Sequence, residues 1–265
     1  MARDLADLDL LTEAALAGGE IALKHFGRNV RKWEKDDDAG PVTEADLEVN
    51  AMLEERLGVA RPNYGWLSEE NEDDADRQAM RLAAERVFII DPIDGTRAFI
   101  AGERGFSVAL AVAERGEIVA AAVCLPARDE IYAAAKGQGV TKNGKPIRAS
   151  DTAALAEATV LASQWQMRDV NWPGGLPPLD RHFRSSLAWR MCLVAEGRFD
   201  SMVTFRQTYE WDIAAGTLIA IEAGASATDG DGAPFRFNSR EGMQPGVISA
   251  PVALHREIMK YRRPG

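Results

Sequence analysis

Apolar positions in two stretches of the first sixty residues recur at steps of three and four, which is the period of an amphipathic helix. The pattern predicts one long helix over residues 5–26. It predicts a second helix from Thr43 onward, because the segment TEAD at 43–46 resembles a capping box placed ahead of LEVNAMLEERL. Two helices therefore open the chain.

Short apolar runs bounded by turn residues come next, and such runs are typical of buried strands. The sequence predicts strands at 87–91, 106–113, 117–125 and 130–135. Glu114-Arg115-Gly116 and Asn143-Gly144 have the composition of tight hairpin turns, so we expect the strands that flank them to pair antiparallel.

The pattern changes near residue 150. Runs typical of strands then alternate with helical patterns, with strands expected at 158–163, 199–205 and 245–250 and helices at 185–197 and 211–224. Residues 165–181, which contain Trp165 and Trp172 among prolines and glycines, predict a long loop.

This change indicates an α+β fold built from two sub-domains. Residues 1–149 predict an N-terminal α+β sub-domain with helices and an antiparallel sheet. Residues 150–265 predict an α/β sub-domain in which strands and helices alternate. A chain of this length can form two such units around a shared core.

Composition and charge limit the partners. Hydrophobic residues make up 46% of the chain, and no apolar run reaches the length of about 18 residues expected of a membrane span. The formal net charge of −10 argues against binding to nucleic acid polymers or anionic membranes. Cys124 and Cys192 both lie in apolar stretches, so we expect buried free thiols and a reducing, cytoplasmic location.

Carboxylates gather where the expected elements begin or end. They are Asp46, Glu69, Asp91, Asp94 and Asp212. Three of them have competing local explanations: Asp46 could cap the second helix, Glu69 could belong to a solvated acidic run, and Asp212 could be a plain N-cap.

The segment DPIDGT at 91–96 is harder to explain by capping alone. Pro92 favours an extended Asp91 and a sharp turn of the backbone just after a buried strand. Gly95 permits a close backbone approach, and Thr96 can open a helix whose N–H groups attract an anion. Two carboxylates attract Mg²⁺ at the same point, so the segment predicts a site for a metal-bound phosphate.

Other chemistries have little support in the sequence. It contains neither a G-x-S-x-G nucleophile motif nor a P-loop. The three histidines, His25, His182 and His255, lie in expected helices or in the long loop, and two cysteines in apolar surroundings do not make a zinc site.

DPIDGTRAF resembles the Asp-Pro-Ile/Leu-Asp-Gly-Thr-x-x-Phe signature of the inositol monophosphatase superfamily, the lithium-sensitive, Mg²⁺-dependent phosphomonoesterases. EWDIAAGTLIAIEAGA is similar to its second signature, with Ala225 in place of the usual second glycine. VTEAD and WLSEE resemble two further elements, the latter with Ser68 in the glycine position. The resemblance covers nearly the whole chain and implies a layered αβαβα sandwich of the sugar-phosphatase type.

The resemblance also implies a metal centre of two or three Mg²⁺ ions. Glu69, Asp91 and the Ile93 carbonyl would hold one ion, and Asp91, Asp94 and Asp212 a second. Glu69 would also help to hold a weaker third ion.

Catalytic roles follow by the same resemblance. Asp46 and Thr96 would orient and deprotonate the attacking water, and the Gly95-Thr96 backbone would bind the phosphate. Lys35, eleven residues before Asp46, would lie near the metals.

The substrate is indicated by weaker features. WLSEE, Arg97-Ala98 and Glu210 look more like bacterial 3′(2′),5′-bisphosphate nucleotidases than like inositol monophosphatases, although histidinol-phosphate phosphatases can also carry Thr-Arg-x-Phe. Expected substrate-side residues are Asp94, Gly95, Thr96, Arg97, Arg168, Arg184 and Glu210. Arg181, Arg190, Trp165 and Trp172 are further candidates for contacts with a second phosphate and an adenine.

The sequence therefore predicts a Mg²⁺-dependent phosphatase, expected to act as a homodimer on a small phosphorylated metabolite, with adenosine 3′,5′-bisphosphate as the expected substrate. Inositol 1-phosphate and histidinol phosphate are the alternatives. A non-catalytic regulator of the same fold would be marked by a lost metal ligand, and all five acidic positions are present.

Overall fold

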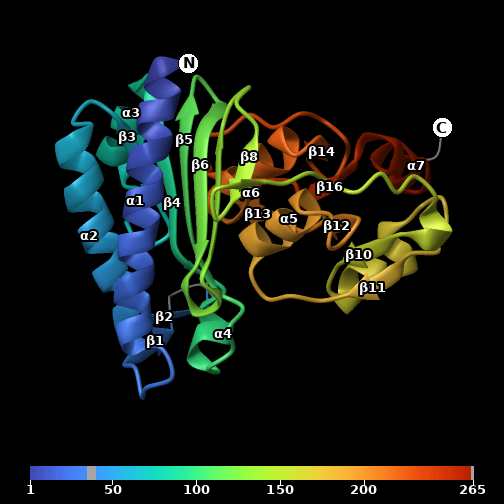
Figure 1. Ribbon diagram of the computed structural model, residues 1–265, viewed down its shortest axis with the longest axis horizontal. Coiled ribbons are helices and arrows are strands. Elements are labelled where there is room, and N and C mark those ends of the chain that lie inside the picture. Colours follow the sequence, from blue (N-terminus) through green and yellow to red (C-terminus); the bar gives the residue numbers. More distant parts are fainter. Residues whose placement is uncertain (35–39, 264–265) are drawn as a thin grey trace.

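The structure is a computed structural model that describes residues 1–34 and 40–263. Its helices and sheets form five layers in the order αβαβα (Figure 1). The layered sandwich implied by the family resemblance is confirmed. None of the helices in the described residues is long and apolar enough to cross a membrane.

The first layer contains α1 (Ala2–His25) and α2 (Glu44–Ala60). Both helices were predicted, and α2 begins with the expected capping box. The Thr43 hydroxyl accepts a hydrogen bond from the Ala45 N–H, and the Asp46 carboxylate accepts one from the Thr43 N–H. Apolar side chains of both helices pack on one face of the first sheet.

The first sheet has seven strands in the order β3-β4-β5-β6-β7-β8-β9. They are β3 (Gly65–Ser68), β4 (Arg86–Asp94), β5 (Ser107–Glu114), β6 (Glu117–Leu125), β7 (Glu130–Ala135), β8 (Val140–Lys142) and β9 (Lys145–Pro146). All neighbours pair antiparallel except β3 and β4, which are parallel. Arg115-Gly116 and Asn143-Gly144 have positive φ, as the predicted tight hairpin turns require.

The middle layer contains α5 (Leu187–Ala195) and α6 (Glu210–Glu222), which lie between the two sheets (Figure 1). Gly216 lets the two helices approach closely, because a Cβ at this position would lie 2.7 Å from the Met191 Cβ. The helices end before Gly197 and Gly224, both with positive φ, as the sequence predicted.

The second sheet has five strands in the order β11-β10-β12-β16-β14. They are β10 (Thr159–Leu161), β11 (Asp180–His182), β12 (Ser201–Thr204), β14 (Ala225–Thr228) and β16 (Val247–Pro251). Helix α7 (Val252–Arg262) covers its outer face. The segment expected to be one long loop contains the 3₁₀ turns Gln164–Met167 and Asp169–Asn171 and reaches into β11.

Shorter elements connect these layers. They are β1 (Lys32–Glu34), β2 (Pro41–Thr43), α3 (Ala75–Ala83), α4 (Thr96–Ile100), β13 (Thr208–Tyr209), β15 (Met243–Gln244), and the 3₁₀ turns Pro126–Arg128 and Leu155–Glu157.

Strand β4 is buried on both faces. Phe88 and Ile90 pack with α1 and α2, whereas Val87 and Ile89 pack with α5 and α6. The second of these cores contains residues from both sides of position 150. The predicted boundary between two sub-domains at residues 149 and 150 stays a prediction. One continuous core contains residues from both sides of it.

Candidate active site

Strand β4 carries two of the expected carboxylates past an irregularity in its pairing with β5. Asp91 pairs with Ala109 and Asp94 with Ser107, so β4 contains one more residue than β5 in this stretch. Residues three apart in a regular strand face opposite sides, and a bulge re-aims the side chains that follow it. The strand was expected to end at Asp91, but it continues to Asp94, and Pro92 lies at the bulge, where a missing N–H is tolerated.

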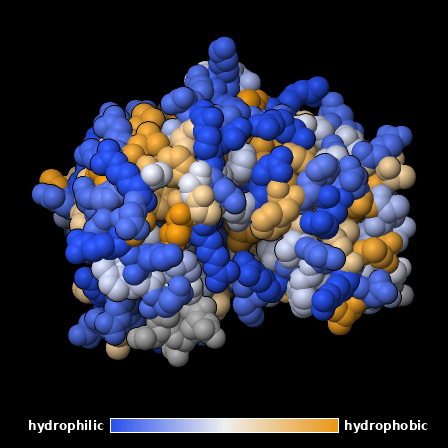
Figure 2. Space-filling model, turned by 90° about the horizontal axis from the view of Figure 1, so that it is seen from below, coloured by the Kyte–Doolittle hydropathy of each residue, from blue (hydrophilic) through white to orange (hydrophobic). Residues whose placement is uncertain are grey.

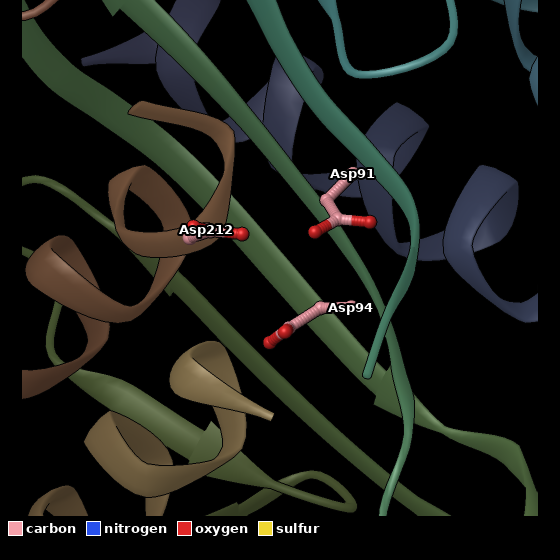
Figure 3. A group of neighbouring side chains, drawn as sticks. All are labelled: Asp91, Asp94 and Asp212. Atoms are coloured by element: carbon pink, nitrogen blue, oxygen red, sulfur yellow. The ribbon is translucent and has the colours of Figure 1, made fainter. Parts of the chain in front are cut away.

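Asp212 joins these two carboxylates from the other half of the chain. One oxygen of each of Asp91, Asp94 and Asp212 lies within 4.8 Å of the others, and Figure 3 shows the three side chains reaching into the same space. The local explanation of Asp212 as an N-cap is wrong, because α6 begins at Glu210 with Tyr209 as its N-cap. We refer to Asp91, Asp94 and Asp212 as the carboxylate cluster.

Asp94 is held by the N-terminus of α5. Its carboxylate accepts hydrogen bonds from the Ser186 hydroxyl, from the Ala188 N–H at 2.7 Å and from the Leu187 N–H at 3.3 Å. A helix N-terminus stabilises a negative charge, so these three donors hold the Asp94 carboxylate in place.

Asp91 has the opposite environment. It is 1% exposed, and neither carboxylate oxygen has a hydrogen-bond partner in the described residues. Buried carboxylates are normally paired or hydrogen-bonded, because an unpaired buried charge costs several kcal/mol or more. The unsatisfied oxygens therefore need a ligand.

The pKa values of the three carboxyl groups are raised by burial, and those of Asp91 and Asp212 also by repulsion from neighbouring carboxylates. Burial, followed by the charges of Glu69, Asp94 and Asp212, raises the pKa of Asp91 well above its usual range. Burial and the neighbouring Asp94 raise that of Asp212 in the same way. Burial also raises the pKa of Asp94 to about 6, although the hydrogen bond from Ser186 opposes the shift.

The cluster fits a hard cation. Its donors are carboxylate oxygens of three residues. Both oxygens of Asp91 have no hydrogen-bond partner in the described residues and are therefore available to an ion. A bound divalent ion would supply the missing partner and reverse the repulsion that raises these pKa values.

Asp46 and Thr96 lie beside each other, as a shared role in positioning water requires. The Thr96 hydroxyl lies 3.1 Å from the Ile93 carbonyl oxygen and 3.4 Å from the Asp46 Oδ1. The other Asp46 oxygen accepts from the N–H and hydroxyl of Thr43. Burial raises the pKa of Asp46 to about 6. The capping role and the proposed catalytic role therefore use different oxygens of one side chain.

Glu69 lies at the end of the neighbouring strand. β3 pairs in parallel with β4, and the Glu69 N–H donates to the Ile90 carbonyl at 3.3 Å, which places Glu69 next to Asp91. Its charge raises the pKa of both Asp91 and Asp46. Glu69 lies outside the group of three whose oxygens are within 4.8 Å of one another.

Gly95 directly follows Asp94 and is the N-cap residue of α4. Its φ is +97°, and a Cβ would lie 3.1 Å from the Gly105 carbonyl oxygen. A side chain here would be strained, so glycine is required for the turn from β4 into α4.

The turn from β4 into α4 lies on the lower side of Figure 1. Figure 2 shows the molecule from this side, and the face seen there is mainly hydrophilic.

The expected substrate arginines are scattered. Arg97 and Arg168 are exposed on α4 and in the 165–181 segment, and Arg181 donates to the Ala162 carbonyl. The Arg184 guanidinium lies over the rings of Trp189 and Phe199. Direct contacts of these arginines with a substrate remain predictions.

Arg190 differs from the other expected substrate arginines, because it is buried and its charge acts on the cluster. It is 6% exposed, and its guanidinium donates to the carbonyls of Arg184 and Ser185. Burial lowers its pKa to about 10, the Asp94 charge opposes this shift, and the Arg206 charge adds to it. Arg206 also lowers the pKa of Asp212. The charges of Arg190 and Arg206 therefore act on carboxylates of the cluster.

Two expected substrate contacts are not favoured by the structure. Glu210 is fully buried, and its carboxylate accepts hydrogen bonds from the N–H groups of Asn238 and Ser239. Trp172 is 1% exposed and packs edge-on against Phe205, so it cannot stack on a nucleotide base. Both side chains are occupied within the protein. Lys35 lies outside the described residues.

Sequence reasoning missed two contributors. Ser186, which precedes an apolar helix, has the local signature of an N-cap, but nothing local indicates that it also donates to Asp94. Arg206 follows a strand without any motif, so only the tertiary structure places its charge near Asp212.

A cavity of about 440 Å³ lies elsewhere. Its lining includes Glu85, Val87, Arg115 and Arg236, and it adjoins the start of β4 rather than its end. The cavity is therefore separate from the carboxylate cluster.

Comparison with known proteins places the site in a family. Residues 5–263 match the model of the "Inositol monophosphatase family". An inositol-1-monophosphatase of Rhizobium meliloti is 34% identical over 243 residues, covering 88% of this chain and 88% of that protein. The 3'(2'),5'-bisphosphate nucleotidase CysQ of Salmonella typhimurium is 30% identical over 233 residues, covering 87% of this chain and 93% of that protein.

A solved structure agrees with these relatives. The IMPase of Thermotoga maritima superposes with a TM-score of 0.81 at 29% identity, covering 98% of this chain and 96% of that chain. Since sequence and fold match over nearly the full length, the chain belongs to the inositol monophosphatase family and is a phosphoric monoester hydrolase.

Proposed function

We propose that the protein is a Mg²⁺-dependent phosphomonoesterase whose substrate carries a second phosphate, with adenosine 3′,5′-bisphosphate as the leading candidate. The observation that carries the metal requirement is the buried Asp91 carboxylate without a protein partner, beside Asp94 and Asp212. Oxygen donors of this kind suit Mg²⁺, which commonly bridges carboxylates and substrate phosphates. The proposed ligands of two or three ions are Glu69, Asp91, the Ile93 carbonyl, Asp94 and Asp212.

When bound, the ions would supply Lewis acidity and neutralise negative charge on the phosphoryl group. The protein's own groups would do the rest. Asp46, with a pKa of about 6, would take the proton of the attacking water, which Thr96 orients through its hydroxyl. Backbone N–H groups of Gly95 and Thr96 would bind the phosphate, and the family resemblance proposes an assisting role for Lys35.

A second phosphate is favoured by Arg190 and Arg206. The Arg190 charge acts on Asp94 and the Arg206 charge on Asp212, and Arg206 is exposed, so it can meet a ligand without rearrangement of the core. Charge-assisted hydrogen bonds to phosphate are the stronger kind and contribute about 1.5–3 kcal/mol each. Arg97, Arg168 and Arg184 remain further proposed contacts.

Inositol 1-phosphate is the second candidate. The relative from Rhizobium meliloti, which is named an inositol-1-monophosphatase, is 34% identical to this chain, compared with 30% for the bisphosphate nucleotidase from Salmonella typhimurium. Histidinol phosphate is a further alternative with the same metal chemistry.

Phosphate release should therefore be measured with Mg²⁺ on adenosine 3′,5′-bisphosphate, fructose 1,6-bisphosphate, inositol 1-phosphate and histidinol phosphate. We expect the nucleotide to have the highest kcat/KM. Replacement of Arg206 by alanine should raise KM for the bisphosphates about tenfold or more and leave inositol 1-phosphate nearly unchanged. Arg256→Ala is the matched control, because Arg256 is exposed on α7 and has no proposed contact with the substrate.

The ranking decides between the substrates. The nucleotide proposal fails if adenosine 3′,5′-bisphosphate ranks last, and the role of Arg206 fails if its variant affects all four esters equally. Turnover that persists in the presence of a strong chelator would contradict the metal requirement, and turnover that is indifferent to Li⁺ would contradict the proposed lithium sensitivity.

The pH dependence of metal-induced stabilisation gives an independent test. Carboxylic acids with raised pKa values bind protons more tightly in the folded state, so their contribution to stability falls as pH rises from about 4 to about 6. Mg²⁺ binds the deprotonated cluster and cancels this loss. We expect the rise in Tm caused by Mg²⁺ to be near zero at pH 5 and about 5 °C or more at pH 7.5.

This difference must be read at each pH against the metal-free protein. Three other carboxyl groups have lowered pKa values, and their contribution to the stability of the protein is lost as pH falls. They are Asp4, Asp73 and Asp200. Their contribution is the same with and without Mg²⁺, so it cancels in the difference. A Mg²⁺ effect that does not grow with pH would contradict a site made of raised-pKa carboxylates.

We also propose that the protein acts in the cytoplasm as a homodimer. Cys124 and Cys192 are buried free thiols, as the sequence predicted, and free thiols persist in a reducing compartment. Light scattering at twice the chain mass would support the dimer, and a monomer at micromolar concentration would contradict it.

A further inference from the structure

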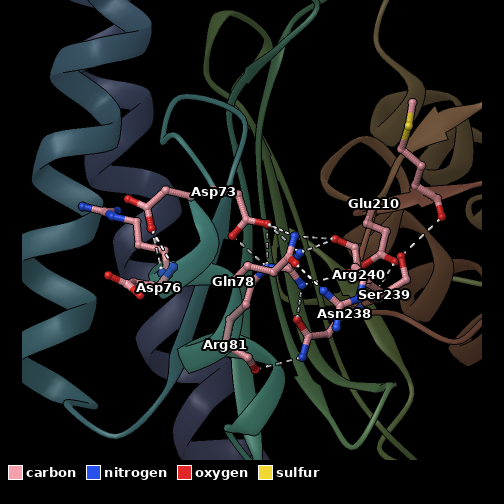
Figure 4. Close-up of polar contacts among 11 residues, drawn as sticks. Asp73, Asp76, Gln78, Arg81, Glu210, Asn238, Ser239 and Arg240 are labelled. Carbon is pink, nitrogen blue, oxygen red and sulfur yellow. Dashed lines mark hydrogen bonds and ion pairs between the residues drawn. The ribbon is translucent and has the colours of Figure 1, made fainter.

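Arg81 connects two segments that belong to opposite sides of the active site. It lies on α3 and is 1% exposed. Asp73 is on one side of it and residues 238–240 are on the other, as Figure 4 shows. These segments are more than 150 residues apart in the chain, so a single buried side chain bridges them.

All five N–H groups of the Arg81 guanidinium are used. Nε donates to both oxygens of Asp73 at 3.0 Å, and Nη2 donates to Asp73 at 2.6 Å and to the Arg240 carbonyl at 3.0 Å. Nη1 donates to the Asn238 Oδ1 at 2.7 Å and to the Ser239 carbonyl at 2.9 Å. A lysine could not satisfy this fork.

The bridge continues to the helix that carries Asp212. The Asn238 and Ser239 N–H groups donate to the two oxygens of Glu210, and Gln244 donates to Glu210 at 2.9 Å. Glu210 is fully buried and is the first residue of α6, two positions before Asp212. Residues 238 and 239 thus fix the start of α6 through a carboxylate (Figure 4).

The other end of the bridge leads to Glu69. Asp73 follows Glu69 by four residues, and the Arg81 guanidinium holds the pKa of the Asp73 carboxyl below its usual range. The same segment is anchored a second time between Glu69 and Asp73, because Asn71 accepts hydrogen bonds at 2.8 Å from Asn50 and Trp66. The Glu69 N–H also donates to the Ile90 carbonyl, so the segment is held at Glu69 itself and at two points after it.

We propose that Arg81 and Glu210 are positioning residues that set the cation affinity of the active site by fixing the Glu69 segment relative to the start of α6. The proposal rests on the proposed function, because it concerns the same cation site. Neither residue is placed in contact with substrate or metal. Their effect is expected on the binding of the ion, since a ligand set drawn from two halves of the chain must be held at one spacing.

Isothermal titration of the metal-free protein with MgCl₂ tests this proposal. Arg81→Met should raise the Kd for Mg²⁺ about tenfold or more, in the range found for residues that support metal ligands. The Mg²⁺ concentration needed for half-maximal activity should rise in parallel, while kcat at saturating Mg²⁺ should change by less than about threefold.

Arg86 provides a matched control. It is 4% exposed and pairs with Asp4, Asp7 and Glu114 at the opposite end of β4. Arg86→Met should lower Tm but leave the Kd for Mg²⁺ within about twofold, because general loss of a buried arginine network does not reach the site. Equal changes in Kd for the Arg81 and Arg86 variants would overturn the proposal, as would an unchanged Kd in Arg81→Met.

Milder variants keep the test decisive if Arg81→Met does not fold. Arg81→Lys and Glu210→Gln should each weaken Mg²⁺ binding, and the double variant should be no weaker than the worse single one, since both act through residues 238 and 239. Fully additive effects would overturn the shared route. If the wild type itself shows no Mg²⁺ binding, the proposed function fails instead, which separates the two outcomes.

Discussion

Asp91→Asn is expected to abolish turnover and to leave the metal-free protein at least as stable as the wild type. The substitution keeps the shape of the side chain but removes a charge that is buried without a donor and repelled by Asp94 and Asp212. The new amide can donate to one of the neighbouring carboxylates, which lie within 4.8 Å. Activity should fall at least about 1,000-fold, because the proposed bridging ligand is lost.

Asp94→Asn is the matched variant with the opposite effect on stability. Its carboxylate accepts three hydrogen bonds from the start of α5, and an amide NH₂ would face one of these donors. Loss of such charge-assisted bonds costs about 1.5–3 kcal/mol each, so the metal-free Tm should drop by several degrees. Both variants should lose activity, yet only one should lose stability.

Thermal unfolding with and without Mg²⁺, together with phosphate release, checks this pair. The increase of Tm caused by Mg²⁺ should disappear in Asp91→Asn. Normal activity in this variant would contradict the two-metal proposal. A Tm that falls as far as in Asp94→Asn would show that Asp91 has a stabilising partner within the protein.

Asp46→Asn should reduce kcat by about 100- to 10,000-fold, the usual contribution of a general base. The Asp46 carboxylate adjoins the Thr96 hydroxyl on one side and caps α2 on the other. Asparagine retains one acceptor for the cap, so the stability cost should stay near 1 kcal/mol or less. The KM for substrate should change little, because the residue is proposed to act on water.

Thr43→Ala separates the two roles of Asp46. It removes the hydroxyl that accepts from Ala45 and donates to Asp46, and so weakens the capping box alone. We expect a loss of about 1 kcal/mol in stability with kcat changed by less than about tenfold. If Thr43→Ala and Asp46→Asn lose the same activity, capping is the whole explanation of Asp46 and its role as a base is wrong.

Several features of the site follow from local sequence. Thr43 and Asp46 form the predicted capping box, the residues around Gly95 form the predicted turn into a helix, and the glycines after α5 and α6 end those helices. Each depends on residues within a few positions of one another. Backbone preferences and capping act over that range, so the sequence is sufficient to predict them.

The tertiary structure decided which of these groups meet. The bulge at Asp91 depends on pairing with β5, and the donors to Asp94 come from a helix more than 90 residues later in the chain. Glu210 was expected to contact the substrate, but its carboxylate accepts hydrogen bonds from the N–H groups of residues 238 and 239. Arg81 had no predicted role. Local composition cannot show such contacts, because they arise only when the two sheets pack around α5 and α6.

The sequence by itself therefore determined the residue types at the candidate site: carboxylates at the ends of elements, a glycine turn and a helix start that suit a cation and a phosphate. Only the tertiary structure decided that Asp91 lacks a hydrogen-bond partner, that the charges of Arg190 and Arg206 act on the cluster, and that Arg81 links the segments on its two sides. The physical reason is distance along the chain. Residue types and local backbone preferences can be identified from short segments of sequence. Burial, charge and hydrogen bonding at the site depend on side chains from both halves of the chain.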